Sequence, residues 1–399
     1  MAELKNHSNH FFLCFNRKAY GMGCELAYSP PMLLDTMSAA IRIIPAGALT
    51  PAELAEWVAI QDANPLLASP FLRPEFTTAV SSVRDDVRVA VIEHSGVPVG
   101  FFSYQRDWMG IGRPVGGPLS DCQGIITKSD FVWDATRLIR DCGLREWWFD
   151  YLLVAQEPFR SFHQVATQLP VIDLSKGYEA YVEDRRRAGS EQITAARRKR
   201  CKIEREVGPL RFEFHSTDRA MLSTLMRWKS SLHRALDRLD AFGFPWVVKL
   251  VEKIHSMQGE SFAGVLSVLY AADKPIAAHV GMRSKTVWEY WFPAYDPTFA
   301  KYSPGIILLL EMAERAPSLG ISTINMGSGP EHYKQRLMNR AIPIAKGVVA
   351  VSPFLSAART SIRRSRVRIR ALLRPSPLDG LVKQAGKTLR RVQPWLSYR

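Results

Sequence analysis

The residues best suited to chemistry lie in the second half of the chain. Ser303, Pro304 and Gly305 stand directly before Ile306–Ala313, an apolar run of helical length. The first N–H groups of a helix have no partners within the helix and carry partial positive charge, so a phosphate or pyrophosphate fits there. Gly305 has no side chain that would block such a group. The pattern predicts a site for a phosphate-bearing ligand, and a plain helix start with Pro304 in its first turn is the alternative.

Two side chains suited to acid–base chemistry precede this segment. His279 interrupts an otherwise apolar run, and because the pKa of histidine lies near neutrality, it could act as a general base. Asp296 follows Tyr295 and could be the base instead, or could orient His279 as the carboxylate of a His–Asp pair. A buried core histidine and an ordinary Asx turn at Asp296 are the alternatives.

Regular elements are expected around these residues. An aromatic strand over Val287–Phe292 precedes the helix, and Gly320 has the residue type that ends a helix. Ile321–Met326 then alternates like a short buried strand. Gly327 breaks this strand, and a polar segment with titratable side chains follows. Strand, helix, strand and loop in this order form a layout that could bind a phosphate-bearing ligand.

Three short motifs in this region resemble those of a known superfamily. They are Y-D-P from Tyr295, Y-S-P-G-I-I-L-L from Tyr302 and G-S-G-P-E-H-Y-K from Gly327. In this order they resemble the GNAT acyltransferases, and more narrowly the CelD/BcsL-type acetyltransferases of bacterial polysaccharide synthesis, close to the FemAB-like tandem-GNAT proteins. The resemblance covers Phe262–Met338. The Gly-rich Q/R-x-x-G-x-G/A loop usual in the superfamily is absent, and Ser303-Pro304-Gly305 stands in its place.

The resemblance implies roles for individual residues. Ser303, Pro304 and Gly305 would hold an acyl-CoA donor such as acetyl-CoA, and no metal is implied. Tyr333 matches the place of a tyrosine that protonates the leaving thiolate in many GNAT enzymes. Lys334 would bind donor phosphate or the acceptor. Asn325, assigned with the donor-binding residues, occupies a strand position where relatives often carry an acid, and an amide can orient a group but cannot act as a base.

The same order of elements occurs twice along the chain. Hairpins are predicted around Pro98 and Pro275, and glycines that end helices are predicted at Gly143 and Gly320; the members of both pairs are 177 residues apart. Two GNAT-like halves are the simplest interpretation, and coincidence between generic α/β segments is the alternative. At the positions that correspond to Ser303–Gly305 the first half has Ile-Thr-Lys, so we expect only the second half to hold the donor, with the first as scaffold or acceptor wall.

Local signals also predict two helices in the first half. Thr50 before Pro51 combines a typical N-cap with a typical first helical residue, which predicts a helix through about Gln61. A second helix is expected over Asp130–Cys142, ended by Gly143.

We therefore expect an α/β protein, an α+β mixed sheet with two tandem GNAT-like domains, the C-terminal one holding the donor site. The expected division is a disordered extension over 1–35, a degenerate N-terminal half over 36–175, a basic linker or helical segment over 176–215, a C-terminal acyltransferase half over 216–352 and a basic tail over 353–399.

Composition narrows the class of protein. The 399 residues are 47% hydrophobic and 23% charged, which is ordinary for a globular protein. No apolar run reaches the roughly 18 residues that span a bilayer, and the first 35 residues lack the order of a signal peptide. The five cysteines are scattered without a zinc-ligand spacing, which favours a reducing cytoplasm.

Two basic segments stand out within the net charge of +15. Residues 359–399 hold 12 Lys and Arg against one acid, Asp379. Arginine alternates with apolar residues over Ala357–Leu373, which suits an anionic membrane surface or a disordered solubilising tail. Between the halves, Arg185–Arg200 is dense in charge. It could bind an anionic ligand such as a lipid diphosphate or tRNA, or could be a solvated helix face.

The predicted function is N- or O-acyl transfer, with an acetyl or similar group moving from acyl-CoA to an amine or hydroxyl. The resemblance implies an acceptor in a sugar, in cellulose or another polysaccharide, or in an envelope precursor. Two alternatives stay open: a FemAB-like aminoacyl transferase that uses aminoacyl-tRNA, and a non-catalytic membrane-associated assembly protein. We expect a cytoplasmic protein, with peripheral contact at the inner face of the membrane left open.

Overall fold

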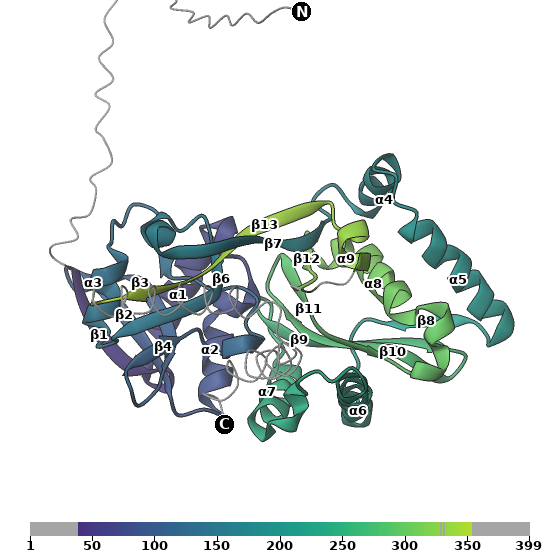
Figure 1. The fold of residues 1–399 in the computed structure, drawn as a ribbon, viewed down its shortest axis with the longest axis horizontal. Coiled ribbons are helices and arrows are strands. Elements are labelled where there is room, and N and C mark those ends of the chain that lie inside the picture. Colours follow the sequence, from purple (N-terminus) through teal and green to yellow (C-terminus); the bar gives the residue numbers. More distant parts are fainter. Residues whose placement is uncertain (1–38, 328, 330–331, 353–399) are drawn as a thin grey trace, which may run out of the picture.

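The computed structural model describes residues 39–327, 329 and 332–352 of the chain. The expectations for 1–35 and 353–399 lie outside these residues. In the described part, strands β1–β13 form one mixed sheet, with helices packed on both of its faces (Figure 1). Along the sheet the strand order is β1-β2-β3-β4-β6-β13-β7-β12-β11-β10-β9-β8, and β5 pairs with β3 beside this path.

The chain forms a first half, a helical connection and a second half. The elements of the first half are β1 (Ala39–Pro45), α1 (Pro51–Asp62), α2 (Pro74–Ser81), β2 (Val87–His94), β3 (Val97–Arg106), β4 (Ile111–Arg113), β5 (Ile126–Thr127), α3 (Ala135–Asp141), β6 (Glu146–Leu153) and β7 (His163–Asp173). The connection consists of α4 (Tyr178–Arg187) and α5 (Gln192–Glu206). The second half contains β8 (Leu210–Glu213), α6 (Arg219–Ala235), α7 (Pro245–Ser256), β9 (Ala263–Ala271), β10 (Lys274–Arg283), β11 (Val287–Tyr295), α8 (Pro304–Arg315), β12 (Thr323–Asn325), α9 (His332–Leu337) and β13 (Arg340–Ala350).

Local sequence signals account for where the predicted helices begin. Thr50 caps α1: its hydroxyl accepts a hydrogen bond from the N–H of Glu53 (3.2 Å), whose carboxylate accepts one from the N–H of Thr50 (2.7 Å). This reciprocal capping box confirms the helix predicted from Pro51. In contrast, α3 is shorter than the predicted 130–142 helix. Asp134 accepts a hydrogen bond from the N–H of Arg137 (2.7 Å) and so starts the helix late.

The two halves repeat the same elements. Pro98 and Pro275 are each the second residue of the second strand of a hairpin, in β3 and β10. Gly143 and Gly320 each follow a helical segment with a left-handed backbone, at φ of 65° and 75°. The register predicted from the sequence is therefore present in the structure.

Helices of the two halves share one hydrophobic core. In the second half, α6 and α7 cover one face of the sheet, and α5, α8 and α9 cover the other (Figure 1). The core under α6 and α7 continues into the first half, where Trp57 of α1 and Phe76 of α2 belong to the same cluster as Leu225 of α6 and Leu250 of α7. The halves are therefore packed together as well as linked.

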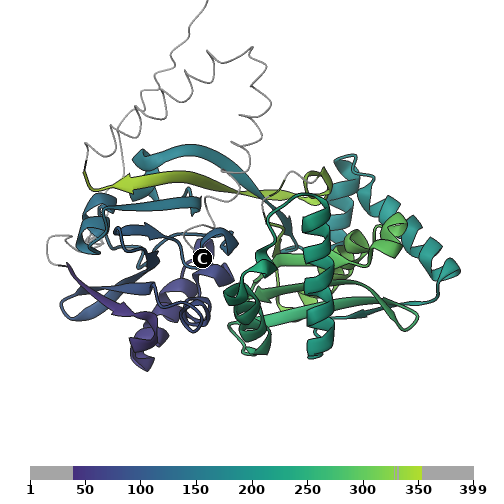
Figure 2. The same cartoon turned by 60° about the horizontal axis from the view of Figure 1, so that its bottom comes forward.

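The last strand of each half crosses to the other. β13 leaves the second half and lies between β6 and β7 of the first (Figure 2), with Val348 opposite Trp148 and Ile342 opposite Leu169. Likewise, β7 of the first half pairs with β12 of the second half, with Ile172 opposite Ile324. The division at 36–175 and 216–352 remains a proposal, and β8 already lies within the expected linker of 176–215.

Among the described residues, no helix has both the length and the apolar character needed to cross a bilayer.

The strand exchange predicts a strong effect at Gly347 of β13. A Cβ there would clash with the carbonyl oxygen of Phe162 and lie 2.6 Å from Cζ of Phe149. We expect Gly347→Ala to lower the free energy of unfolding by about 2 kcal/mol or more, measured by urea denaturation. Gly243→Ala is the matched control, because no heavy atom lies within 4 Å of a Cβ at that position. Equal stability of the two variants would contradict the exchange.

Candidate active site

The parallel pairing of β11 with β12 ends at Glu289 and Asn325. Three residue pairs form this ladder, the last being Glu289 opposite Asn325. Beyond it β11 continues to Tyr295 paired with β10, while the backbone of Gly327 turns back and donates a hydrogen bond to Oδ1 of Asn325 (3.1 Å). The two strands therefore part at Glu289, which places this carboxyl at the end of a parallel ladder.

The Glu289 carboxyl is held inside the protein. Glu289 is 1% exposed, and the hydroxyl of Ser69 donates a hydrogen bond to Oε1 of Glu289 (2.8 Å). Burial, and after it the carboxyl of Asp121, raise the pKa of Glu289 to about 8, and hydrogen bonds from Ser69 and Asn325 oppose the shift. A carboxyl with a pKa near neutrality can both accept and return a proton, as a general base requires.

Asp121 reaches this site from the first half. Gly327 has a left-handed backbone, with φ of 68°, and a Cβ there would lie 2.8 Å from Oδ2 of Asp121. Only a glycine therefore allows the carboxylate so close. Burial raises the pKa of Asp121 to about 7, Lys334 opposes the shift and Asp150 adds to it, although part of the residue stays accessible to solvent.

Lys334 completes a polar group between the halves. It is 7% exposed, and its Nζ donates to the carbonyl of Gly327 (3.4 Å). We call Ser69, Asp121, Glu289, Asn325 and Lys334 the interhalf cluster. A buried cation beside Asp121 stabilises the negative charge of that carboxyl, while Asp121 in turn raises the pKa of Glu289.

In the first half, the parallel strands β4 and β6 also part, but another segment of the chain fills the space between them. There β4 and β6 pair only through Ile111–Gly112 and Glu146–Trp147. Beyond this pairing Gln123 takes the partner's place: its N–H donates to the carbonyl of Tyr151 (3.0 Å), and its carbonyl accepts from the N–H of Leu153 (3.1 Å). This agrees with the proposal that only the second half binds a donor, and the same segment carries Asp121 to the interhalf cluster.

The start of α8 has no side-chain cap. Ser303, the residue before the helix, has a left-handed backbone with φ of 53°, and no side chain caps α8. Lys199 of α5 donates a hydrogen bond to Oγ of Ser303 (2.6 Å). A Cβ at Gly305 would meet only Cδ1 of Tyr295, at an ordinary 3.7 Å. Internal packing therefore does not require a glycine there, whereas close approach of a ligand would.

Tyr290 connects α8 with α9. Its hydroxyl donates to the carbonyl of Gly305 (3.1 Å). Burial raises the pKa of Tyr290 well above its usual value, and the neighbouring phenol of Tyr333 adds to this shift. The structure thus brings Tyr333 close to the segment Ser303–Gly305, as the predicted site requires.

His279 is placed as a structural residue. It is fully buried, at the bulge where β10 changes register between Val280 and Met282. Its Nε2 lies 3.0 Å from the carbonyl oxygen of Glu289 and 3.2 Å from the backbone nitrogen of Trp291. Burial lowers the pKa of His279 to about 3, which leaves it a weak base at neutral pH.

The expected His–Asp pair does not form. Oδ1 of Asp296 accepts hydrogen bonds from the N–H and the hydroxyl of Thr298 (2.9 and 2.8 Å) and so caps η8 (Pro297–Tyr302). Nδ1 of His279 has no hydrogen-bond partner among the described residues. Asp296 thus makes the Asx turn that was the alternative, because its short side chain reaches the backbone two residues on.

Sequence reasoning missed Glu289 and Asp121. Glu289 carried a usable signal, since it is the one acid within the aromatic strand W-E-Y-W-F. Asp121 carried none, because it lies in an irregular segment of the other half.

Internal ion pairs match much of the charge between the halves. Glu183 binds both Arg186 and Arg187 (2.7 and 2.8 Å), and Arg200 pairs with Glu311. These pairs favour the solvated helix face over a clamp for an anionic ligand.

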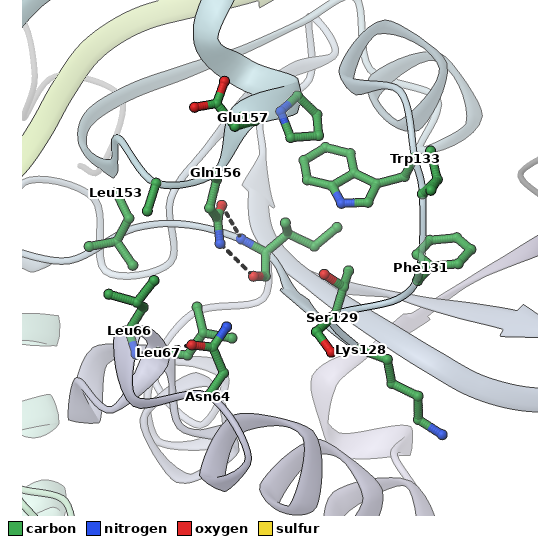
Figure 3. A pocket seen from close by; sticks show the side chains of 15 residues that line it. Asn64, Leu66, Leu67, Lys128, Ser129, Phe131, Trp133, Leu153, Gln156 and Glu157 are labelled. Atoms are coloured by element: carbon green, nitrogen blue, oxygen red, sulfur yellow. Dashed lines mark hydrogen bonds between the residues drawn. The ribbon is translucent and has the colours of Figure 1, made fainter. Parts of the chain in front are cut away.

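A separate cavity of about 320 Å³ opens in the first half (Figure 3). Its wall includes Trp133 and Gln156, whose amide holds the backbone of Ile125 through two hydrogen bonds (2.7 and 3.0 Å). No member of the interhalf cluster lines it. The cavity is therefore distinct from the candidate site.

Within residues 39–327, 329 and 332–352, no three His, Cys, Asp or Glu side chains are grouped so that they could hold a metal ion.

Comparisons with known proteins agree with this geometry. Residues 190–335 match the family model of the acetyltransferase (GNAT) domain. The structure is similar to that of FemX, with a TM-score of 0.55, 9% identity and coverage of 79% of this chain and 99% of that one. It is also similar to a conserved protein of unknown function from Bacteroides thetaiotaomicron, with a TM-score of 0.51, 12% identity and coverage of 78% and 100%. No curated protein matches the sequence.

These matches confirm the predicted mixed α/β fold, with a GNAT domain over residues 190–335, and the family match supports an acyltransferase. The narrower CelD/BcsL resemblance and the link to polysaccharide synthesis remain proposals.

The raised pKa of Glu289 predicts a pH-dependent stability. An unfolded chain loses this proton near pH 4.5 and the folded protein near pH 8. Between these values the folded state holds a proton that the unfolded state has lost, so the free energy of unfolding falls as pH rises, by at most about 1.4 kcal/mol per pH unit. Glu289→Gln should remove this part of the slope in urea titrations across that range.

Glu252→Gln, at an exposed position of α7, is the control and should leave the slope unchanged. A slope in Glu289→Gln equal to that of the wild type would show that the carboxyl is ionised in the folded protein.

Proposed function

We propose that this protein transfers an acetyl or similar acyl group from acyl-CoA to an amine or hydroxyl on a sugar or envelope precursor. One observation carries the proposal: a buried carboxyl with a raised pKa, Glu289, stands where β11 and β12 part, and its neighbour Tyr290 binds the uncapped start of α8. An acid–base group and a contact to the proposed phosphate site therefore lie on consecutive residues of β11, at the point where it parts from β12.

Donor binding would use the start of α8. The N–H group of Gly305 would face the pyrophosphate of CoA, with Lys199 adding positive charge beside Ser303. The positive φ of Ser303 is costly for a residue with a Cβ, by about 1 kcal/mol or more. The contact with Lys199 helps to hold this conformation ready for the ligand.

The chemical step needs one base and one acid. Glu289 would take a proton from the acceptor amine or hydroxyl as the nitrogen or oxygen attacks the thioester carbon. The new C–N or C–O bond forms while the C–S bond breaks, and Tyr333 would protonate the departing thiolate. Asn325 would orient Glu289, and Lys334 would offset the negative charge of Asp121 beside it. This assigns the base to Glu289, because His279 is buried and bound to backbone.

Two alternatives lead to different donors or to none. An aminoacyl-tRNA donor would need a basic surface, and the pairing of Arg186, Arg187 and Arg200 with acids makes acyl-CoA the first donor to test. A non-catalytic assembly protein would have no use for a proton-exchanging carboxyl at the interhalf cluster.

Thermal stabilisation tests the donor site. Acetyl-CoA should raise the Tm of the wild type, since a ligand at 100 times its Kd adds about 2.7 kcal/mol to the free energy of unfolding. Gly305→Trp should abolish the shift by filling the space over the start of α8. Gly305→Ala should fold with an unchanged or slightly higher Tm, because its Cβ has room, but should bind the donor more weakly.

No shift with acetyl-CoA, CoA or longer acyl-CoAs would contradict a CoA donor, and tRNA binding would then be measured. A full shift in Gly305→Trp would place the donor elsewhere.

Kinetics test the base. With any amino sugar or sugar that supports CoA release, Glu289→Gln should lower kcat by about 10²–10⁴-fold with little change in the KM for the donor. In the wild type kcat/KM should rise with pH through about 8, as Glu289 loses its proton. Asp296→Asn is the matched control and should keep its activity. Loss in Asp296→Asn with retention in Glu289→Gln would reverse the assignment.

A further inference from the structure

An aromatic residue projects fully into solvent at one end of the first half. Trp108 is 92% exposed and its neighbour Met109 is 44% exposed. Both lie in the turn Asp107–Gly110 between β3 and β4. Most tryptophans bury the greater part of their surface, and a large apolar side chain left in water often marks an interaction site.

The turn is ordered, so the exposure is built into the fold. Oδ1 of Asp107 accepts hydrogen bonds from the N–H groups of Met109 and Ile111 (both 2.9 Å). The N–H of Gly110 donates to the carbonyl of Asp107 (3.0 Å), and Gly110 has the left-handed backbone that closes such a turn, with φ of 77°. The backbone therefore presents Trp108 and Met109 in a fixed place.

Arginines surround this tip. The N–H of Arg145 donates to the carbonyl of Gly110 (2.9 Å), and the stem of Arg145 lies beside the turn. Arg106 precedes the turn, with Nη1 3.7 Å from the position of a Cβ at Gly143, and Arg140 ends α3 just before Gly143. In the described part of the chain, Arg106, Arg140 and Arg145 take part in no ion pair with a carboxylate. Their charge is available to an anionic partner.

The basic tail leaves the fold at the same place. Ala350 of β13 pairs with Glu146, which also pairs with Ile111 beside the turn. The N–H of Val351 donates to the carbonyl of Arg145 (3.0 Å). The chain that follows carries 12 Lys and Arg and one acid over 359–399. A second positive segment therefore follows in the sequence after the end of β13.

We propose that the Trp108–Met109 tip, with Arg106, Arg140 and Arg145, docks on the surface of an anionic phospholipid bilayer. Tryptophan favours the boundary between headgroups and acyl chains, where its ring is buried and its N–H stays hydrated. Arginines beside it bind lipid phosphates. The positive charge of this face also opposes its pairing with the same face of a second copy. The proposed membrane contact therefore lies on the folded first half.

Vesicle sedimentation of the full-length protein tests this. The protein should bind vesicles of phosphatidylcholine that contain phosphatidylglycerol better than phosphatidylcholine alone, and salt should weaken binding. Trp108→Ala combined with Met109→Ala should lower the partition coefficient at least about fivefold. Arg106→Gln combined with Arg145→Gln should lower it about fivefold per residue and flatten the salt dependence.

Val97→Ala is the matched control, since Val97 is 52% exposed at the opposite end of β3. It should bind vesicles as the wild type does, and all variants should keep the wild-type Tm. Unchanged binding by Trp108→Ala with Met109→Ala would overturn the proposal and leave the tail alone responsible. Absence of vesicle binding by the wild type would overturn it too. The proposal would also be overturned if the wild type self-associates and the Trp108→Ala, Met109→Ala variant does not. That result would show that the tip binds a second copy of the chain.

Discussion

Backbone hydrogen bonds across the exchanged strands hold the molecule together. β13 closes the ladder of the first half against β6, and β7 closes that of the second against β12. Because of this pairing, neither half has an unpaired edge strand at the middle of the sheet. Without it, backbone N–H and C=O groups there would be left without partners. The relative position of the halves is fixed by the ladder, and every distance across the interhalf cluster depends on it.

The exchange explains why polar groups can be buried between the halves. Carboxyls removed from water are costly unless they are protonated, paired or hydrogen-bonded. Glu289 receives a hydrogen bond from Ser69, and Asp121 faces Lys334. Apolar contacts around them, such as Trp291 against Phe71 (5.9 Å between ring centroids), exclude water from the same junction. The pKa values of both carboxyls rise because burial disfavours their charged forms, and that rise makes a proton exchange near neutral pH feasible.

The halves contribute unequally to the site. The first half fills its own opening with the segment around Gln123, so the start of α8 in the second half is the place left for a donor. The first half instead supplies Ser69 and Asp121 at the boundary. Under the proposed function, the second half would hold the donor and the first half would supply a positioning surface.

Local chemistry within a few residues determined much of the fold. The capping box of Thr50 and Glu53, the hairpins around Pro98 and Pro275, and the left-handed glycines Gly143 and Gly320 are set by neighbours in the chain, so they could be predicted. The start of α8 at Ser303–Gly305 could be predicted for the same reason.

Only the tertiary structure determined which acidic side chains lie close to each other. Glu289 and Asp121 lie far apart in sequence and on different halves, and their proximity follows from the strand exchange, which leaves no local pattern. His279 has the residue type of a base, yet it is buried at a bulge of β10, where its ring contacts the backbone carbonyl of Glu289. Residue type and spacing therefore identified the region and its elements. The protonation chemistry depends on burial and on long-range neighbours, which the folded chain alone creates.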